Sequence, residues 1–334
     1  MIGPTRSIFT CVAACFALSS CGGGLRDNDL PTAPPTHPPP ARASRIFVTS
    51  SSIAPAVLTF DATASGNVAP SSTLSGSLTG LTSPLAVGHD SLGDLYVLNS
   101  SGASYQVLSF AAASSGNVAP NTTLTGSQTD MRVPVAMAIN GLGHIHIADA
   151  GNGDVLVYPP AANGNVAPST VIGGANTLIQ NPAGISTDAI NDIAVSSSST
   201  SAIYEFSPAQ AGNQAPIRTI EGSNTQLQTP QALAFDSHSN LWVADGSRVL
   251  EFPELFNINP VPVVSLSGSQ TQITAPAAIA VDPAGYLYVA NSPALCSASS
   301  ILVFSPGANG NVAPVQVISG SATQMACITG LSTQ

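Results

Sequence analysis

Four residues with oxygen-bearing side chains recur at one position of a repeated segment. Asn99, Asp149, Asp245 and Asn291 end the runs DLYVLN, HIHIAD, NLWVAD and YLYVAN. Carboxylate and amide oxygens are the donors that Ca²⁺ takes, and they also hold polar ligands such as glycans. The same side chains cap turns by accepting backbone N–H groups. Their recurrence at equivalent positions favours capping, with Ca²⁺ or ligand binding as the alternative.

Two more polar residues, Arg132 and Gln231, flank the starts of the repeated segments VPVAMAIN (133–140) and TPQALAFD (229–236). They complete the set of candidate ligand residues. No Ser/His/Asp set, Cys/His pair or H-x-x-E cluster gathers with them in the sequence. The sequence therefore predicts no catalytic residue, and Ca²⁺ is the one cofactor that the polar positions leave open.

The histidines offer a second kind of chemistry. His144 and His146 are two residues apart, so a strand would point both imidazoles to the same face, where they can bind a metal. His146, however, stands where Tyr96, Trp242 and Tyr288 stand in other copies of the segment. This equivalence favours a packed side chain over a metal ligand.

Four short segments that recur in fixed order must position these residues. In one copy they read SPLAVGHD (83–90), DLYVLNS (94–100), QVLSF (106–110) and TLTG (123–126). Each alternates apolar and polar residues between Gly, Asn, Asp and Pro, which is typical of strands. Four strands in each repeat of about 50 residues predict a blade of a β-propeller.

The two ends of the repeat region complement each other. RIFVTS (45–50) matches the second segment with no first segment before it, and CITGLST (327–333) matches the first with no second after it. Pairing them closes the ring and removes open sheet edges. The prediction is an all-β, six-bladed propeller of four-stranded blades over residues 45–334.

The phrase GNVAP occurs at 66–70, 116–120, 164–168 and 310–314, with GNQAP at 212–216 and INPVP at 258–262. It falls between the third and fourth segments of each copy. Gly and Asn tolerate the positive φ of a tight turn, and proline suits the start of an edge strand. A phosphate-binding loop would need a following helix, so the phrase predicts a turn at the outer rim.

Residues 276–291, PAAIAVDPAGYLYVAN, with SILVF at 300–304, resemble the NHL-repeat propellers, and the likeness extends over 45–334. Within that group the chain resembles the bacterial lipoprotein type. The resemblance implies a propeller and leaves open an RNA reader, a protein-interaction module or a lyase or lactonase. The arginine often found before the third strand of these repeats is present here at Arg248 alone.

Charge argues against nucleic acid as a partner. The chain has seven Lys and Arg residues in total and a formal net charge of −10. Binding to phosphates requires clustered basic side chains that release counterions. We therefore expect no nucleic-acid partner.

The N-terminal segment has the pattern of an export signal that is removed by cleavage. One arginine precedes the short apolar run SIFTCVAACFA, and LSSC ends at Cys21. This ending resembles the bacterial lipobox, which implies a signal peptide over 1–20 and a lipid on Cys21. The segment 21–44 is rich in proline and predicts an extended tether. We expect an extracytoplasmic, membrane-anchored protein, at the outer membrane or cell surface.

Cys296 and Cys327 are the cysteines left after the signal and the lipid site. An oxidising compartment permits a disulfide between them, with two free thiols as the alternative. The sequence thus predicts a lipid-anchored binding or interaction module with a protein or glycan partner. A metal-dependent propeller lyase, lactonase or hydrolase, and a structural envelope component, are the alternatives.

Overall fold

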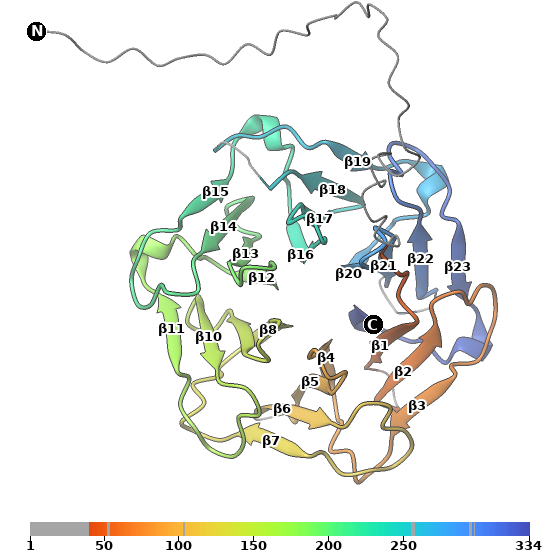
Figure 1. The fold of residues 1–334 in the computed structure, drawn as a ribbon, viewed down its shortest axis with the longest axis horizontal. Helices are drawn as coiled ribbons and strands as arrows, with labels where there is room; N and C mark the ends of the chain where they lie inside the picture. The colour runs from red at the N-terminus through yellow and green to blue at the C-terminus, as the bar shows by residue number, and fades with distance from the viewer. Residues whose placement is uncertain (1–39, 52–53, 103, 255–257, 294–295, 297) are drawn as a thin grey trace, which may run out of the picture. The chain divides into compact units, whose positions relative to one another are not determined.

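The chain folds into six four-stranded antiparallel sheets that stand as blades around a central axis (Figure 1). The computed structural model describes residues 40–51, 54–102, 104–254, 258–293, 296 and 298–334. These residues belong to one compact unit, Pro40–Gln334. The predicted signal peptide and Cys21 lie outside the described residues, as does the tether up to residue 39. The predicted six-bladed propeller is confirmed.

Each blade runs from an inner strand to an outer one, and the blades are numbered from the one that holds the N-terminal strand. Blade 1 is β24 (Ile328–Thr333), β1 (Arg45–Ser50), β2 (Ala56–Asp61) and β3 (Ser72–Ser75); blade 2 is β4 (Pro84–His89), β5 (Leu95–Ser100), β6 (Tyr105–Phe110) and β7 (Thr122–Thr125); blade 3 is β8 (Pro134–Ile139), β9 (Ile145–Asp149), β10 (Asp154–Tyr158) and β11 (Thr170–Gly173).

The other three blades repeat the pattern, and short 3₁₀ turns follow four of the outer strands. Blade 4 is β12 (Pro182–Thr187), β13 (Ile193–Ser197), β14 (Ala202–Phe206) and β15 (Arg218–Ile220); blade 5 is β16 (Pro230–Phe235), β17 (Leu241–Asp245), β18 (Arg248–Phe252) and β19 (Val264–Leu266); blade 6 is β20 (Pro276–Val281), β21 (Leu287–Asn291), β22 (Ser300–Phe304) and β23 (Gln316–Ser319). The turns are η1 (Ala175–Thr177), η2 (Ser223–Thr225), η3 (Ser269–Thr271) and η5 (Ser321–Thr323).

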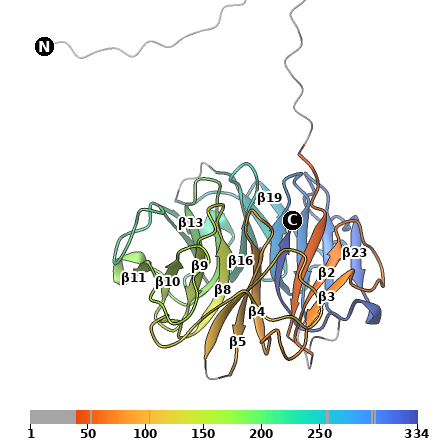
Figure 2. The ribbon, with the colours of Figure 1, turned by 60° about the horizontal axis from the view of Figure 1, so that its bottom comes forward.

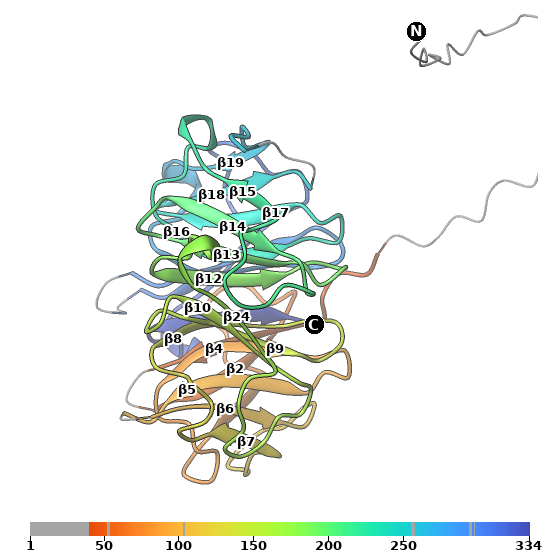
Figure 3. The same cartoon turned by 90° about the vertical axis from the view of Figure 1, so that its left-hand side faces the viewer.

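Two faces follow from this order. The upper face carries the loops between blades and the loops from second to third strands, and the lower face carries the other turns. The inner strands run between the two faces. The lower face, which carries the C-terminus, is turned toward the top of Figure 2, and in Figure 3 the faces are seen edge-on with the lower face on the right.

The ring closes through the two chain ends. β24 pairs antiparallel with β1, with Phe47 opposite Ser332 and Val48 opposite Leu331. The inner strands β24 and β4 then pack side by side, as do the inner strands of the other neighbouring blades. The predicted closure by one strand from each terminus is confirmed.

The apolar core lies between blades. One cluster joins Phe47, Val57 and Leu74 of blade 1 to Leu95 and Phe110 of blade 2, all buried. Similar clusters recur around the ring. Each blade is therefore stabilised by its neighbours, as expected of a repeat whose single unit cannot bury its own faces.

The GNVAP-type segments lie between third and fourth strands, as predicted, but they also join neighbouring blades. Gly116 N donates to Thr73 O at 2.7 Å, and Ser75 N donates to Gly116 O at 3.1 Å, so the segment pairs with the outer strand β3 of the preceding blade. The Asn117 Oδ1 then accepts the Leu78 N–H at 2.7 Å. The segment thereby covers an edge that would otherwise stay unpaired.

The asparagine contact recurs at every boundary between blades. Gly76 has φ +116°, and a Cβ there would come within 2.6 Å of the Asn117 Cγ, so this close approach requires glycine. Five further Asn Oδ1 atoms accept the equivalent N–H group of the preceding blade: Asn67 from Ala322, Asn165 from Gln128, Asn213 from Asn176, Asn259 from Asn224 and Asn311 from Gln270.

The first described residues pack on the lower face of blade 6. The Arg42 guanidinium lies 4.1 Å from the centre of the Tyr286 ring and donates to the Tyr288 hydroxyl at 3.2 Å. Ala43 N donates to Asp282 Oδ2 at 3.1 Å. Residues 42–44, which the sequence groups with the tether, thus contact the propeller directly.

Candidate functional site

The central channel is lined by aliphatic and small residues. Its narrow part has a volume of about 90 Å³, with Leu85, Val135, Ala183 and Ile279 among the lining residues. Toward the lower mouth it widens to about 270 Å³, where Ser186, Ser332 and His89 join the wall. Gly184 keeps the inner strands close, because a Cβ there would lie 1.9 Å from the Gln231 carbonyl oxygen.

The four predicted oxygen donors all lie buried at the upper ends of second strands. Asn99 Oδ1 accepts the N–H groups of Thr82 and Ser83, each at 3.0 Å. Asn291 Oδ1 accepts those of Thr274 and Ala275, each at 2.9 Å. These bonds are the turn caps that the equivalent positions favour.

The two aspartates make the same caps. Asp149 accepts the Arg132 N–H at 2.7 Å and the Val133 N–H at 3.1 Å. Asp245 accepts the Gln228 N–H at 2.9 Å and the Thr229 N–H at 2.6 Å. Because these oxygens already hold backbone donors, a Ca²⁺ ion or ligand would have to displace them, and that role stays a prediction.

The other two candidate residues are on the surface. The Arg132 side chain is 64% exposed and pairs with Asp130 at 3.4 Å. Gln231 is exposed near the start of β16, and its carbonyl oxygen accepts the Ser196 hydroxyl at 2.9 Å. The structure thus brings Arg132 close to Asp149 and leaves Gln231 on a different blade.

A carboxylate pair on blade 3 was not predicted from the sequence. Asp154 lies directly opposite Asp149 in the β9–β10 ladder, and within the described residues its buried Oδ1 has no hydrogen-bond partner. Burial, with the charges of Asp149 and Asp130, raises the pKa of Asp154 to about 6. The strand register, once assigned, is the signal that places the two acids together.

Blade 4 buries a charge cluster on its lower side. Carboxylate oxygens of Asp188, Asp192 and Glu205 lie within 4.8 Å of one another. Arg218 pairs with Asp192 at 3.1 Å and with Glu205 at 2.5 Å. Burial raises the pKa of Glu205 to about 7, against the opposing effect of Arg218. Arg218 compensates part of the negative charge, so the cluster is a buried ion-pair network.

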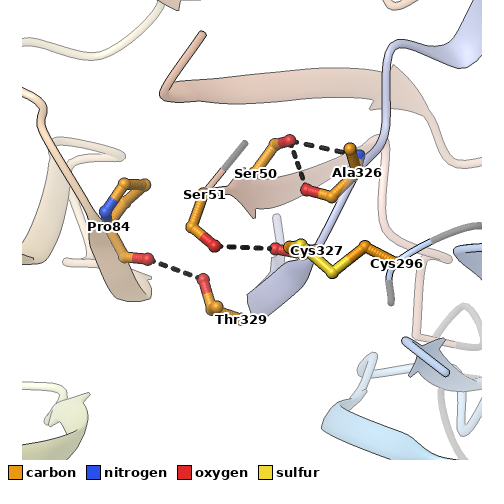
Figure 4. Close-up of a disulfide and its surroundings, with 7 residues drawn as sticks. All are labelled: Ser50, Ser51, Pro84, Cys296, Ala326, Cys327 and Thr329. Atoms are coloured by element: carbon orange, nitrogen blue, oxygen red, sulfur yellow. Dashed lines mark hydrogen bonds between the residues drawn. A yellow bond between two sulfur atoms is a disulfide. The ribbon is translucent and has the colours of Figure 1, made fainter. Parts of the chain in front are cut away.

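The predicted disulfide is present on the upper face. Cys296 and Cys327 are bonded with their Cα atoms 4.6 Å apart (Figure 4). Ser51 N donates to the Cys327 carbonyl at 3.2 Å, and the Ser50 hydroxyl donates to the Ala326 carbonyl at 2.7 Å. The bond therefore links blade 6 to the closure blade.

A groove with a volume of about 870 Å³ lies on the upper side of blade 6, and Pro293, Ala298, Val317 and Met325 form its apolar lining. Hydroxyl and amide groups supply its polar lining, including the predicted ligand residue Asn291. Ser299 is buried, and among the described residues its Oγ has no hydrogen-bond partner. The polar lining residues are Gln272, Thr274, Asn291, Ser299, Ser300, Ser319 and Ser321.

His89, His144 and His238 lie toward the lower face, opposite the oxygen-bearing caps. His89 Nδ1 is 2.8 Å from the Ser332 Oγ, and His238 lies in an exposed turn. His146 is 2% exposed, which confirms the predicted packed position between blades. Burial, with the neighbouring His144, lowers the pKa of His146 to about 4.

Comparison with known proteins supports the fold. A protein of unknown function from Bacteroides caccae is similar over 87% of this chain and 98% of its own, with a TM-score of 0.59 and 12% identity. A candidate 6-phosphogluconolactonase from Bacteroides uniformis covers 84% of each chain, with a TM-score of 0.53 and 18% identity. The WD40 propeller domain of Doa1 covers 83% of this chain and 79% of its own, with a TM-score of 0.53 and 13% identity.

No protein-family model matches the chain, and no curated protein matches it in sequence. At these identities the structural likeness establishes a β-propeller and no activity. No helix among the described residues is long and apolar enough to span a membrane.

Proposed function

We propose that the protein is a lipid-anchored, extracytoplasmic binding module of NHL type that holds an uncharged, hydroxyl-rich ligand, such as a glycan, in the upper groove of blade 6. The observation that carries the proposal is the groove itself. It has about 870 Å³ of space and seven hydroxyl or amide side chains in its lining.

The chemistry of the lining favours a neutral ligand. Hydroxyl and amide groups both donate and accept hydrogen bonds, which is what a chain of hydroxyl groups requires. No charged residue lines the groove among the described residues, so a charged ligand would find no ionic partner there. The Ser299 Oγ, which has no hydrogen-bond partner within the described residues, offers one to a ligand.

The position of the chain entry fits an anchored protein. Arg42 and Ala43 dock on the lower face, beside Asp282, whereas the groove residue Asn291 lies at the opposite end of the same blade. The described part of the chain therefore begins on the side of blade 6 away from the groove.

The test is to block the groove and compare a matched site. Ser321→Trp places an indole in the groove, whereas Ser269→Trp places one at the equivalent position of η3 on blade 5. Both variants are measured on an array of neutral oligosaccharides, with the wild-type chain as reference. We expect binding that Ser321→Trp abolishes and Ser269→Trp preserves. No binding by the wild type, or equal loss in both variants, would overturn the proposal.

A further inference from the structure

Most blades have an aromatic residue near the start of the second strand, such as Tyr96, Trp242 and Tyr288. This position is called the aromatic seat. In blade 2, Tyr96 donates its hydroxyl to Asp90 Oδ2 at 3.4 Å. In blade 6, Tyr288 donates to Asp282 Oδ2 at 3.0 Å. In both blades a carboxylate of the lower turn thus accepts a hydrogen bond from the tyrosine hydroxyl.

Blade 3 fills this seat differently. His146 replaces the tyrosine, and Asn140 replaces the aspartate of the turn. The Asn140 Oδ1 accepts the N–H groups of Leu142 at 3.1 Å and His144 at 2.9 Å. In the described part of the chain, the buried Nδ1 atoms of His144 and His146 have no hydrogen-bond partner.

A cavity lies beside these histidines. A space of about 230 Å³ lies between blades 3 and 4, and both His144 and His146 line it. A water molecule takes about 30 Å³ of liquid volume, so the cavity has room for an ion together with several waters. Blade 4 contributes Asn191, Ile193, Pro208 and Gln210 to the wall.

We propose that His144 and His146 bind a late first-row transition-metal ion, such as Zn²⁺ or Cu²⁺, in this cavity. Neutral imidazole nitrogens are preferred ligands of these ions, whereas Ca²⁺ and Mg²⁺ prefer oxygen. His144 lies in the turn before β9 and His146 lies within β9, and both line the cavity. Each has a buried Nδ1 with no hydrogen-bond partner among the described residues. Water supplies the remaining ligands.

The surroundings favour a cation. Asn191 lines the cavity, and the next residue is Asp192 of the blade 4 charge cluster. That cluster holds three carboxylates against the single guanidinium of Arg218, so it adds a negative potential beside the cavity.

The first test is calorimetric titration of the untagged full chain with Zn²⁺, and with Mg²⁺ as the control ion. We expect one saturable Zn²⁺ site and no Mg²⁺ site. His146→Tyr restores the residue type of blades 2 and 6, and His144→Asn restores that of Asn240 in blade 5, so both variants should fold. Each should weaken Zn²⁺ binding at least tenfold, whereas His238→Asn should not.

The second test identifies the donors. Cu²⁺ bound to the wild-type chain should give an electron paramagnetic resonance spectrum with splitting from two nitrogen donors, reduced to one in His146→Tyr. Absence of saturable Zn²⁺ binding to the wild type would overturn the proposal. Binding that survives both His144→Asn and His146→Tyr would overturn it as well.

Discussion

Blades 3 and 5 are both four-stranded sheets, but they differ in the pair of side chains that face each other at the upper ends of the second and third strands. In blade 5, Asp245 faces Arg248 across the ladder, and their charges meet at 2.7 Å. In blade 3, Asp149 faces Asp154 instead, and one oxygen of Asp154 stays without a partner in the described structure. One substitution in the repeat thus converts an ion pair into a like-charge pair.

The lower ends of blades 3 and 5 also differ in whether a buried polar group has a hydrogen-bond partner. In blade 5, the Trp242 indole N–H donates to Asp236 Oδ2 at 3.4 Å. In blade 3, His146 and Asn140 occupy these positions, and the His146 Nδ1 is left unused among the described residues. Unsatisfied buried groups are costly, so their presence in a chain that satisfies the same positions elsewhere marks blade 3 as a place for function.

The largest expected effect comes from removing the Asp245–Arg248 ion pair of blade 5. Asp245→Ala removes the acceptor of the Gln228 and Thr229 N–H groups and leaves Arg248 without its carboxylate. We expect the free energy of unfolding to fall by about 3–5 kcal/mol. Chemical denaturation measures the loss, and Ser247→Ala, at an exposed position, should change it by less than about 0.5 kcal/mol. Equal losses in both variants would contradict the role of Asp245.

A smaller effect of opposite sign is expected in blade 3. The raised pKa of Asp154, about 6 against a usual 3.8, means that the folded state keeps a proton that the unfolded state has lost. Stability contributed by this group is therefore present below about pH 4 and is lost as pH rises to about 6. Asp154→Asn should raise the free energy of unfolding by about 1–3 kcal/mol at pH 7 and leave it unchanged at pH 4.

Denaturation curves at the two pH values test the sign of this effect. Asp130→Asn is the control, because Asp130 is 43% exposed and its charge is better screened. A stabilisation by Asp154→Asn of the same size at pH 4 and pH 7 would show that packing, and not charge, is responsible.

The smallest expected effect comes from replacing Asn140 and His146, at the lower end of blade 3, by their counterparts in blade 5. The double variant Asn140→Asp with His146→Trp fills part of the cavity and gives the indole N–H a carboxylate acceptor. We expect a gain of about 1 kcal/mol in the free energy of unfolding, together with loss of Zn²⁺ binding. A loss of stability would show that the cavity cannot take the larger ring.

Much of the fold could be predicted from the sequence because it depends on features that repeat. The period, the strand pattern and the complementary ends at 45–50 and 327–333 were enough to predict six blades and their closure. The capping role of Asn99 and Asn291 could be anticipated because equivalent positions favour a structural role. The disulfide was predictable as a candidate from the two cysteines that lie outside the predicted export signal and lipid site.

Other features depend on which segments become neighbours in the fold. The repeat pattern of the sequence does not reveal these neighbours. The pairing of Gly116 with the strand of the preceding blade requires knowing which outer strand lies beside the turn. The Asp149–Asp154 pair requires the strand register. The groove of blade 6 depends on residues from several segments that meet only in the fold, and the His144–His146 cavity depends on side chains of blades 3 and 4 that meet there.

The most direct test of the contrast between blades is a crystal structure of the protein grown with Zn²⁺, with data collected at the zinc absorption edge. We expect an anomalous peak within bonding distance of His144 and His146, and no peak near Trp242, which occupies the equivalent position in blade 5. Absence of a peak at the histidines, or a peak at both seats, would contradict it.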